Sequence, residues 1–90
     1  MVPLFPLGRL VATRGAMALM EAARIDPLEL LRRHQSGDWG DLDEEDRREN
    51  DYAVSRFLRI FSAYGKSPDR LWVITEADRS VTTILRPDEY

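Results

Sequence analysis

The 90-residue chain contains no cysteine and only one histidine, His34. Without cysteine it can form no disulfide, and it offers neither a thiol nucleophile nor a thiolate metal ligand. A structural zinc site takes its four ligands mainly from cysteine and histidine, so the chain cannot supply one. We therefore expect no metal site and no cofactor.

The sequence also lacks long hydrophobic runs and targeting signals. The apolar segment Met1–Leu10 is interrupted by two prolines and one glycine. The remaining runs are too short for a signal-peptide core or for the about 20 residues that span a bilayer. We expect residues 1–8 to form an extended tail that leads into a short strand. These absences favour a soluble cytoplasmic protein with no membrane partner.

The overall composition of the sequence is typical of a globular domain. Hydrophobic residues make up 43% and charged residues 32% of the sequence, unlike a disordered or membrane-spanning chain. A chain of this length builds one modest hydrophobic core. Because the sequence has no internal repeat and no linker, residues 1–90 are predicted to form a single domain.

Three segments carry the signals that begin helices. The clearest is Asp26-Pro27-Leu28-Glu29, which combines an N-cap carboxylate, a proline at the first helical position and a glutamate three residues after the cap. Thr13 and Asp43 can cap the two other helices. Acidic residues 44–46 would lie in a first turn, where the helix dipole favours negative charge. The predicted helices span Gly15–Ala23, Pro27–Ser36 and Glu44–Ser55.

The last third of the chain is rich in β-branched and aromatic residues, which favour strands. Loops at 65–69 and 77–80 separate these segments, and strands with such short connections pair as an antiparallel meander. The sequence thus predicts an α+β fold, with two to three N-terminal helices packed on a three- to four-stranded antiparallel sheet. The predicted strands span Arg9–Thr13, Arg56–Tyr64, Leu71–Glu76 and Val81–Leu85.

Both faces of this sheet carry large apolar side chains. Trp72 and Ile74, for example, project opposite to Val73 along their strand. The helices can cover only one of the two faces. We expect the N-terminal segment to cover the other, and the alternative occupant is a partner, including a second copy of the chain in a homodimer.

The charge of the chain is unevenly distributed. Residues 38–51 hold eight acidic residues and two arginines, a formal charge of −6, whereas the remaining 76 residues carry +3. The spacing excludes a calcium loop, because Gly40 and Leu42 would fall at positions that need oxygen-bearing side chains. The segment is either a solvated, capped helix start or an acidic edge that binds a protein or mimics nucleic-acid phosphates.

Direct binding to duplex DNA is not expected. The twelve arginines and one lysine are scattered along the chain and do not alternate with aromatic residues. The isoelectric point is near 5.1, whereas nonspecific duplex binding depends on neutralising phosphates with a basic surface.

His34 is the residue that an enzyme would most need. It follows two arginines near the end of a predicted helix, where a cation suits the helix dipole, so a surface or capping role is favoured. The alternative is a small ribonuclease-like toxin, in which His34, Glu76 and Arg79 would be base, acid and phosphate clamp. A separation of His34 from Glu76 beyond about 10 Å, with no cleft between them, would exclude this enzyme.

Two loops hold the residues that we predict to bind a partner. Residues 76–80 place two acids and an arginine in a tight turn, where Arg79 either pairs internally or is presented to a phosphate or carboxylate. Trp39 is either a plug beneath the third helix or an exposed aromatic contact. The predicted partner-binding residues are Asp38, Trp39, Asp41, Glu76, Asp78 and Arg79.

Two stretches are distinctive, HQSGDWGDL at 34–42 and VITEADRSVTTILRPDEY at 73–90. Together with Asp46, Asn50-Asp51 and Ser62-Ala63-Tyr64, they resemble a family of small bacterial proteins found on plasmids, phages and integrated elements, which usually carry plasmid-related labels. The resemblance covers about residues 10–90. Some relatives are labelled a methylation subunit of a type I restriction enzyme. This chain lacks a glycine-rich cofactor loop and an Asn-Pro-Pro-aromatic motif, and it is too short for a methyltransferase.

The resemblance implies an accessory protein of a mobile element. Small proteins of such elements often bind a host or element-encoded protein, and some inhibit restriction or CRISPR systems. The acidic edge and the missing catalytic set agree with this implication. We therefore expect a non-enzymatic protein-binding module, one form of which is an inhibitor of a host defence system.

Overall fold

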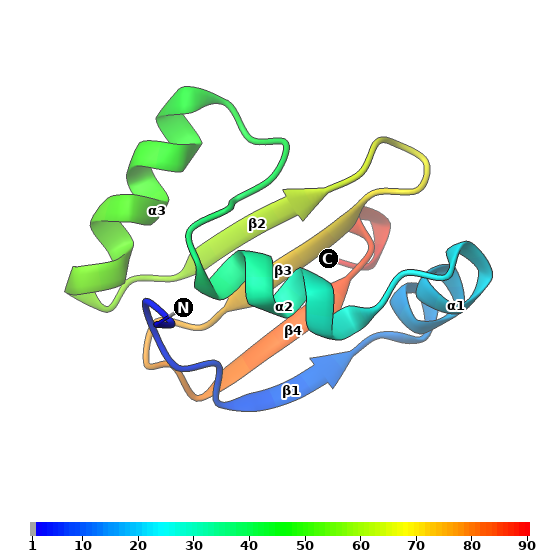
Figure 1. The fold of residues 1–90 in the computed structure, drawn as a ribbon, viewed down its shortest axis with the longest axis horizontal. Coiled ribbons are helices and arrows are strands. Elements are labelled where there is room, and N and C mark those ends of the chain that lie inside the picture. Colours follow the sequence, from blue (N-terminus) through cyan, green and yellow to red (C-terminus); the bar gives the residue numbers. More distant parts are fainter. Residues whose placement is uncertain (1) are drawn as a thin grey trace.

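A computed structural model describes residues 2–90, and Figure 1 shows the fold. Within these residues, one sheet of four strands has the order β1–β4–β3–β2. Three α-helices lie between β1 and β2, and a short 3₁₀ helix, η1, follows β4. The predicted α+β architecture is confirmed. The elements are β1 (Arg9–Ala12), α1 (Arg14–Ala23), α2 (Pro27–Gln35), α3 (Glu44–Arg56), β2 (Ile60–Tyr64), β3 (Leu71–Thr75), β4 (Val81–Leu85) and η1 (Pro87–Glu89).

The three C-terminal strands form the predicted antiparallel meander, with β3 between β2 and β4. β1 adds to the outer side of β4 in parallel, with Arg9 opposite Val81 and Ala12 opposite Ile84. A tight turn would force an antiparallel neighbour, but here three helices separate β1 from the meander. The sheet is therefore mostly antiparallel, with one parallel edge strand.

Each α-helix begins at the N-cap that the sequence predicts. The capping side chain accepts a hydrogen bond from a backbone N–H in the first turn, which satisfies a donor that the helix leaves unpaired. The observed helices match the predicted bounds to within one residue at each end. The three N-cap residues are Thr13, Asp26 and Asp43.

The predicted strand Arg56–Tyr64 is wrong at its start. Arg56 is the last residue of α3, and Phe57 has a left-handed backbone with φ of 53°. The Phe57 N–H bonds to the carbonyl of Ala53 and ends the helix, so β2 begins only at Ile60. The boundary was hidden because Phe57 occupies a conformation that glycine usually takes at a helix end.

The core lies between the helices and one face of the sheet, as Figure 1 shows for α2 in front of β3 and β4. Apolar side chains of α1 and α2 pack there against residues such as Val73 and Ile84. A second cluster lies where α3 meets β2, and it consists of Phe5, Trp39, Ala53 and Ile60. The two clusters place every α-helix on the same side of the sheet.

The N-terminal segment does not cover the second face, so that prediction is wrong. Phe5 is buried on the helix side, edge-on to the His34 ring (centroids 5.2 Å apart) and stacked on Trp39 (6.3 Å). The Phe5 carbonyl accepts a hydrogen bond from Gln35 Nε2 (2.8 Å). The expected tail is thus a docked segment, because Phe5 fills space in the core. Met1, its first residue, lies outside the described residues.

The end of the chain covers part of the second face instead. The Tyr90 ring packs edge-on against Trp72 (5.7 Å), which is in turn edge-on to Phe61 (5.0 Å). Arg59 donates a hydrogen bond to the Tyr90 hydroxyl (2.5 Å). As a result, Phe61 and Trp72 are half-buried on a face that no α-helix covers.

Candidate functional site

His34, for which the sequence favours a surface or capping role, is fully buried at the end of α2. Its Nδ1 lies 2.5 Å from Ser62 Oγ and its Nε2 lies 2.9 Å from Thr75 Oγ1. Thr75 Oγ1 lies 2.7 Å from Thr82 Oγ1, and the Thr82 hydroxyl donates to the Leu7 carbonyl (2.7 Å). The prediction is wrong because hydroxyls on two strands, Ser62 on β2 and Thr75 on β3, satisfy the imidazole inside the core.

The Leu7 carbonyl is the last acceptor in this series of hydrogen bonds, and it determines the direction of each bond back to His34 Nε2. The Leu7 carbonyl can only accept, so the single hydroxyl proton of Thr82 is used there. Thr82 Oγ1 must then accept from Thr75, and Thr75 Oγ1 must accept from His34 Nε2–H. These donors place a proton on His34 Nε2. Because the lowered pKa also keeps the imidazole neutral, the other ring nitrogen, Nδ1, accepts from the Ser62 hydroxyl.

The electrostatic surroundings keep His34 neutral. Burial, with a smaller contribution from the positive charge of Arg79, lowers the pKa of His34 to about 3. Both ring nitrogens are already hydrogen-bonded within the core. The imidazole therefore has no free lone pair or proton with which to act on a substrate.

We expect acid to destabilise the protein from about pH 6.5 downwards because of His34. The unfolded chain binds a proton at this residue with the ordinary pKa of about 6.5, whereas the folded chain does so only near pH 3. The unfolded state therefore takes up more protons between these values, and the stability present above pH 6.5 is lost as the pH falls. The free energy of unfolding should drop by about 2 kcal/mol between pH 6.5 and pH 5.

Urea unfolding followed by circular dichroism at several pH values measures this slope. The control is His34→Gln, whose stability should change little over the same interval. Because the chain has a single histidine, the imidazole NMR signals also report on His34 alone. Signals that titrate near pH 6.5 in the folded protein would contradict the prediction.

Glu76 lies on the opposite face of the sheet from His34. Side chains alternate along a strand, so Thr75, which contacts His34, and the following Glu76 project to opposite faces. The Glu76 carboxylate pairs with Arg59 (3.2 Å), which also reaches Tyr90 on the second face. The sheet thus separates the base and the acid that the ribonuclease hypothesis requires to act together.

Arg79 is also buried, with 6% of its surface exposed. Its Nη1 donates to the Leu58 carbonyl (2.6 Å) and its Nη2 to the Ala53 carbonyl (2.8 Å), with longer bonds to three further carbonyls. Ala53 lies in the last turn of α3, where a cation interacts favourably with the helix dipole. Arg79 therefore ties the β3–β4 turn to α3 and is not presented to a phosphate or a partner.

Trp39 and Gly40 close the outer edge of β2. Trp39 is buried, and its indole N–H donates to Asp51 on α3 (3.0 Å). Gly40 forms a parallel bridge with Ala63: the Ala63 N–H donates to the Trp39 carbonyl (3.1 Å), and the Asp41 N–H donates to the Ala63 carbonyl (2.7 Å). Trp39 is thus a plug, as one interpretation of the sequence expected, and its ring is not available to a partner.

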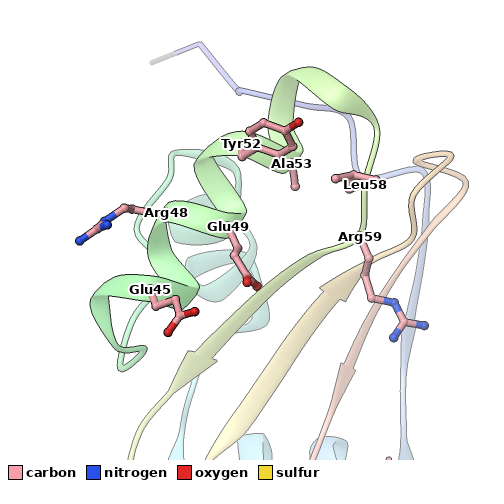
Figure 2. Close-up of a pocket in the computed structure, with 7 residues that line it drawn as sticks. All are labelled: Glu45, Arg48, Glu49, Tyr52, Ala53, Leu58 and Arg59. Carbon is pink, nitrogen blue, oxygen red and sulfur yellow. The ribbon is translucent and has the colours of Figure 1, made fainter.

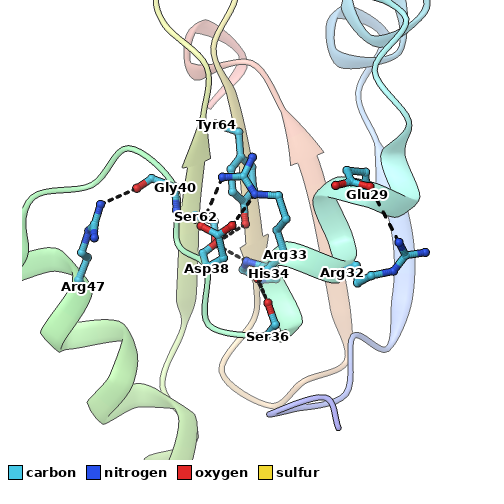
Figure 3. Close-up of polar contacts among 10 residues, drawn as sticks. All are labelled: Glu29, Arg32, Arg33, His34, Ser36, Asp38, Gly40, Arg47, Ser62 and Tyr64. Carbon is cyan, nitrogen blue, oxygen red and sulfur yellow. Dashed lines mark hydrogen bonds and ion pairs between the residues drawn. The ribbon is translucent and has the colours of Figure 1, made fainter. Parts of the chain in front are cut away.

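Asp38 is held in a cluster of side chains around Tyr64 (Figure 3). Its carboxylate accepts two hydrogen bonds from Arg33 (2.6 and 3.3 Å), and this interaction lowers the pKa of Asp38. The Arg33 guanidinium lies over the Tyr64 ring (4.4 Å), and the Tyr64 hydroxyl donates to the Asp38 carbonyl (2.7 Å). The charge of Asp38 is therefore largely balanced within the chain.

The remaining predicted residues do not form one surface with these. Asp41 is exposed in the loop that covers β2. Asp78 is exposed in the β3–β4 turn, where its carboxylate accepts from the Ser80 hydroxyl and N–H, which lowers the pKa of Asp78. Trp39 and Arg79 are interior, so among the six predicted partner-binding residues only Asp41 and Asp78 combine exposure with a charge that forms no ion pair within residues 2–90.

A different surface, between α3 and the start of β2, combines accessible apolar and acidic side chains (Figure 2). It is an open hollow of about 590 Å³. Tyr52 is 55% and Leu58 47% exposed. Figure 2 shows the carboxylates of Glu45 and Glu49 directed toward β2, whereas Arg48 points away. We name this surface the α3 patch, and it is lined by Glu45, Arg48, Glu49, Tyr52, Ala53, Leu58 and Arg59.

The lining of the α3 patch contains two glutamates and two arginines. Together with Glu44 and Glu76, the acids that these arginines pair with, the surface holds four acids and two arginines, a formal charge of −2. Arg48 pairs with Glu44 (3.1 Å), and Arg59 pairs with an acid on the sheet (3.2 Å), so both bordering arginines are engaged outside the patch. Glu45 and Glu49 form no ion pair within residues 2–90. The hollow therefore presents free carboxylates beside exposed apolar side chains.

Asn50 fixes α3, and with it the patch, to the edge of β2. Its side-chain amide donates to the Phe61 carbonyl (2.6 Å), and its side-chain oxygen accepts from the Phe61 N–H (3.1 Å). Trp39 and Arg79 hold the middle and the end of the same helix. The patch is thus mounted on a helix with three separate attachments to the rest of the fold.

The sequence predicts the acidic segment but not the apolar half of the α3 patch. Glu45, Glu49 and Tyr52 share one helical face through spacings of four and three residues, and this signal is present in the sequence. Leu58 and Arg59 follow the helix and reach the patch only because the left-handed Phe57 turns the chain. Their participation depends on a backbone conformation that the composition does not suggest.

In comparisons with known proteins, no family model, no curated protein and no solved structure matches the chain. Within residues 2–90, no group of three or more His, Asp or Glu side chains is arranged to hold a metal ion. Over the same range, every helix is too short or too polar to span a bilayer. A functional proposal must therefore come from the chain's own residues.

Proposed function

We propose that this chain is a non-enzymatic protein-binding module that contacts its partner through the α3 patch. The observation that carries the proposal is the adjacency of two exposed apolar side chains, Tyr52 and Leu58, to the unpaired carboxylates of Glu45 and Glu49. Apolar side chains gathered at one exposed site are typical of interaction surfaces, and tyrosine is enriched among the residues that dominate binding energy. The partner is a protein surface on which Lys or Arg side chains surround an apolar anchor.

The rigidity of the patch supports this role. Asn50 and Arg79 hold α3 at two points, through the Phe61 backbone and the Ala53 carbonyl. A surface that is already ordered before binding loses little conformational entropy on association. The patch therefore suits recognition of a folded partner without rearrangement of this chain.

The sequence resemblance supplies the biological setting that we propose. The module belongs to the accessory proteins of plasmids, phages or integrated elements, and its partner is a host or element-encoded protein. Defence complexes that act on nucleic acid carry basic surfaces for phosphates, which are complementary to the charge of the α3 patch. Inhibition of a restriction or CRISPR complex is the form of this function to test first.

The ribonuclease alternative is not supported by the arrangement of its three residues. His34 is sealed in the core, Arg79 donates to backbone carbonyls, and Glu76 lies on the other side of the sheet. A general base must come within hydrogen-bond reach of the proton it removes. We expect induced expression of the chain to leave cellular RNA intact.

Affinity capture with tagged protein from host lysate tests the proposed function. We expect the amount of captured partner to fall at least about tenfold for Glu45→Gln/Glu49→Gln and for Tyr52→Ser/Leu58→Ser, because each pair removes one half of the interface chemistry. Capture should also weaken as salt rises, since charge attraction is screened. Quantitative mass spectrometry of the bound fraction measures both effects.

The matched control is Glu21→Gln/Asp69→Asn, which removes the same charge from exposed residues outside the α3 patch. This variant should capture the partner as well as the wild type does. Equal capture by the patch variants, or no enriched protein at any salt concentration, would count against the proposed function.

A further inference from the structure

The two edges of the sheet differ, because one is closed by other parts of the chain and the other is open. The outer edge of β2 is closed by the Gly40 bridge to Ala63 and by the side chain of Asn50 on Phe61. β1, at the opposite edge, pairs only with β4. An open edge offers a row of unpaired backbone groups with which another chain can pair.

The register shows which groups of β1 are unpaired. The N–H of Arg9 donates to the Ser80 carbonyl (2.9 Å), and the N–H of Thr13 donates to the Ile84 carbonyl (3.0 Å). Alternate residues of a strand direct their backbone groups to opposite sides, so the N–H and C=O of Leu10 and Ala12 point away from β4. These four groups form a ladder that another strand can continue.

An apolar hollow of about 220 Å³ runs beside this ladder, between β1 and α2. Leu10 is 53%, Val11 42% and Leu28 60% exposed along it. Thr82 is the one polar side chain in its lining, and its hydroxyl is already bonded to the Leu7 carbonyl. The hollow thus fits an apolar side chain from a strand that is paired with β1.

The charge at the two ends of β1 indicates which strand fits. Arg9 and Arg14 flank the strand, and the segment Gly8–Arg14 contains no acidic residue. Neither arginine forms an ion pair within the described residues. Glu29, the acid that follows Leu28 on α2, is outside the lining of the hollow and is paired with Arg32 (3.9 Å). A strand with acidic ends is therefore favoured, whereas a second copy of β1 would bring further arginines to the site.

We propose that the outer edge of β1 binds an extended peptide segment of a partner protein by strand addition. The backbone of the segment pairs with Leu10 and Ala12, alternate apolar side chains enter the hollow beside α2, and acidic residues at its ends meet Arg9 and Arg14. β1 and β2 form the two opposite edges of the sheet, and the α3 patch lies at the β2 edge (Figure 1). The chain then has two independent contact surfaces and can hold two proteins, or two parts of one.

Two labelled peptides test the proposal, Glu-Val-Thr-Val-Thr-Val-Glu and its counterpart with Lys in place of both Glu. We expect the acidic peptide to bind at least about tenfold more tightly and to shift the amide NMR signals of Leu10 and Ala12. Arg9→Glu/Arg14→Glu should reverse the preference. Lys66→Glu/Arg70→Glu, which makes the same charge change in the β2–β3 loop away from β1 and from the α3 patch, should keep it.

Leu10→Pro removes an outward-facing N–H together with the Leu10 side chain that lines the hollow, and it is expected to reduce binding at least about tenfold. Circular dichroism checks that Leu10→Pro folds. If it does not fold, Arg9→Glu/Arg14→Glu and its control variant still test the proposal. Glu45→Gln/Glu49→Gln should bind the peptide normally, which separates this proposal from the α3 patch. The proposal would be overturned by failure of both peptides to bind at about 1 mM, by equal affinities, or by a dimer that Leu10→Pro dissociates.

Discussion

Replacing Arg79 by methionine is expected to lower the free energy of unfolding by about 4 kcal/mol. Methionine has a similar length but loses the charged hydrogen bonds to the Leu58 and Ala53 carbonyls, each worth about 1.5–3 kcal/mol. It also removes a cation from the end of α3, where Arg56 alone remains. A domain of this size is stable by only about 5–13 kcal/mol in total, so the variant should unfold at much lower urea concentration.

Two variants control this measurement. Arg48→Met removes an arginine that is 75% exposed, and its effect should stay within about 0.5 kcal/mol. Arg79→Lys keeps the charge but loses the forked geometry that reaches several carbonyls, so it should lie between wild type and Arg79→Met. If Arg79→Met is as stable as Arg48→Met, Arg79 does not hold the β3–β4 turn to α3.

Replacing Gly40 by alanine should cost about 3 kcal/mol. Gly40 has φ of +76°, a conformation that costs other residues about 1 kcal/mol or more. A Cβ at this position would lie 2.0 Å from the Ala63 carbonyl oxygen, so the loop must move away from β2. That movement breaks the two backbone hydrogen bonds to Ala63, each worth about 1 kcal/mol.

Gly37→Ala is the matched control for Gly40→Ala. Gly37 also has a positive φ, of +86°, but a Cβ there would meet only the flexible end of the Leu4 side chain, at 3.1 Å. The control should therefore cost about 1 kcal/mol, the backbone penalty alone. Urea unfolding of both variants measures the difference, and equal losses would show that the close approach to β2 contributes nothing.

Gly40 also changes the meaning of the most distinctive motif in the sequence. The sequence predicts that Asp38, Trp39 and Asp41 of this motif bind a partner, yet Gly40 is required by backbone contact and Trp39 by packing. Asp38 is engaged by Arg33. The specificity of this motif therefore reflects the closing of a sheet edge, and the binding surface that we propose lies on the next helix.

The helices could be predicted from the sequence because their signals are local. Asp26, for example, caps α2 by accepting a hydrogen bond from Leu28, only two residues away. The strands of the meander are likewise joined by short turns, so their order follows from the chain itself. The parallel pairing of β1 was not predictable, because its partner β4 lies beyond three helices.

The candidate site was predicted less well than the fold. Glu45 and Glu49 belong to the acidic segment that the sequence indicates, but Leu58 joins them only through the turn at Phe57. The charge of Arg79 predicts a binding residue, but the fold places that charge at the end of a helix. The charge of a residue therefore does not by itself show that its side chain is exposed, although charged residues usually are.

The sequence by itself determined the capped helices, the antiparallel meander and the lack of cysteine-based chemistry, because each depends on residue type or on neighbours within a few positions. Only the tertiary structure decided which polar groups are interior. The partners of His34 are Ser62 and Thr75, which lie 28 and 41 residues away, and the Ala53 carbonyl that Arg79 binds is 26 residues away. Hydrogen bonds over such separations depend on how the elements pack, and that packing also leaves the α3 patch and the edge of β1 open.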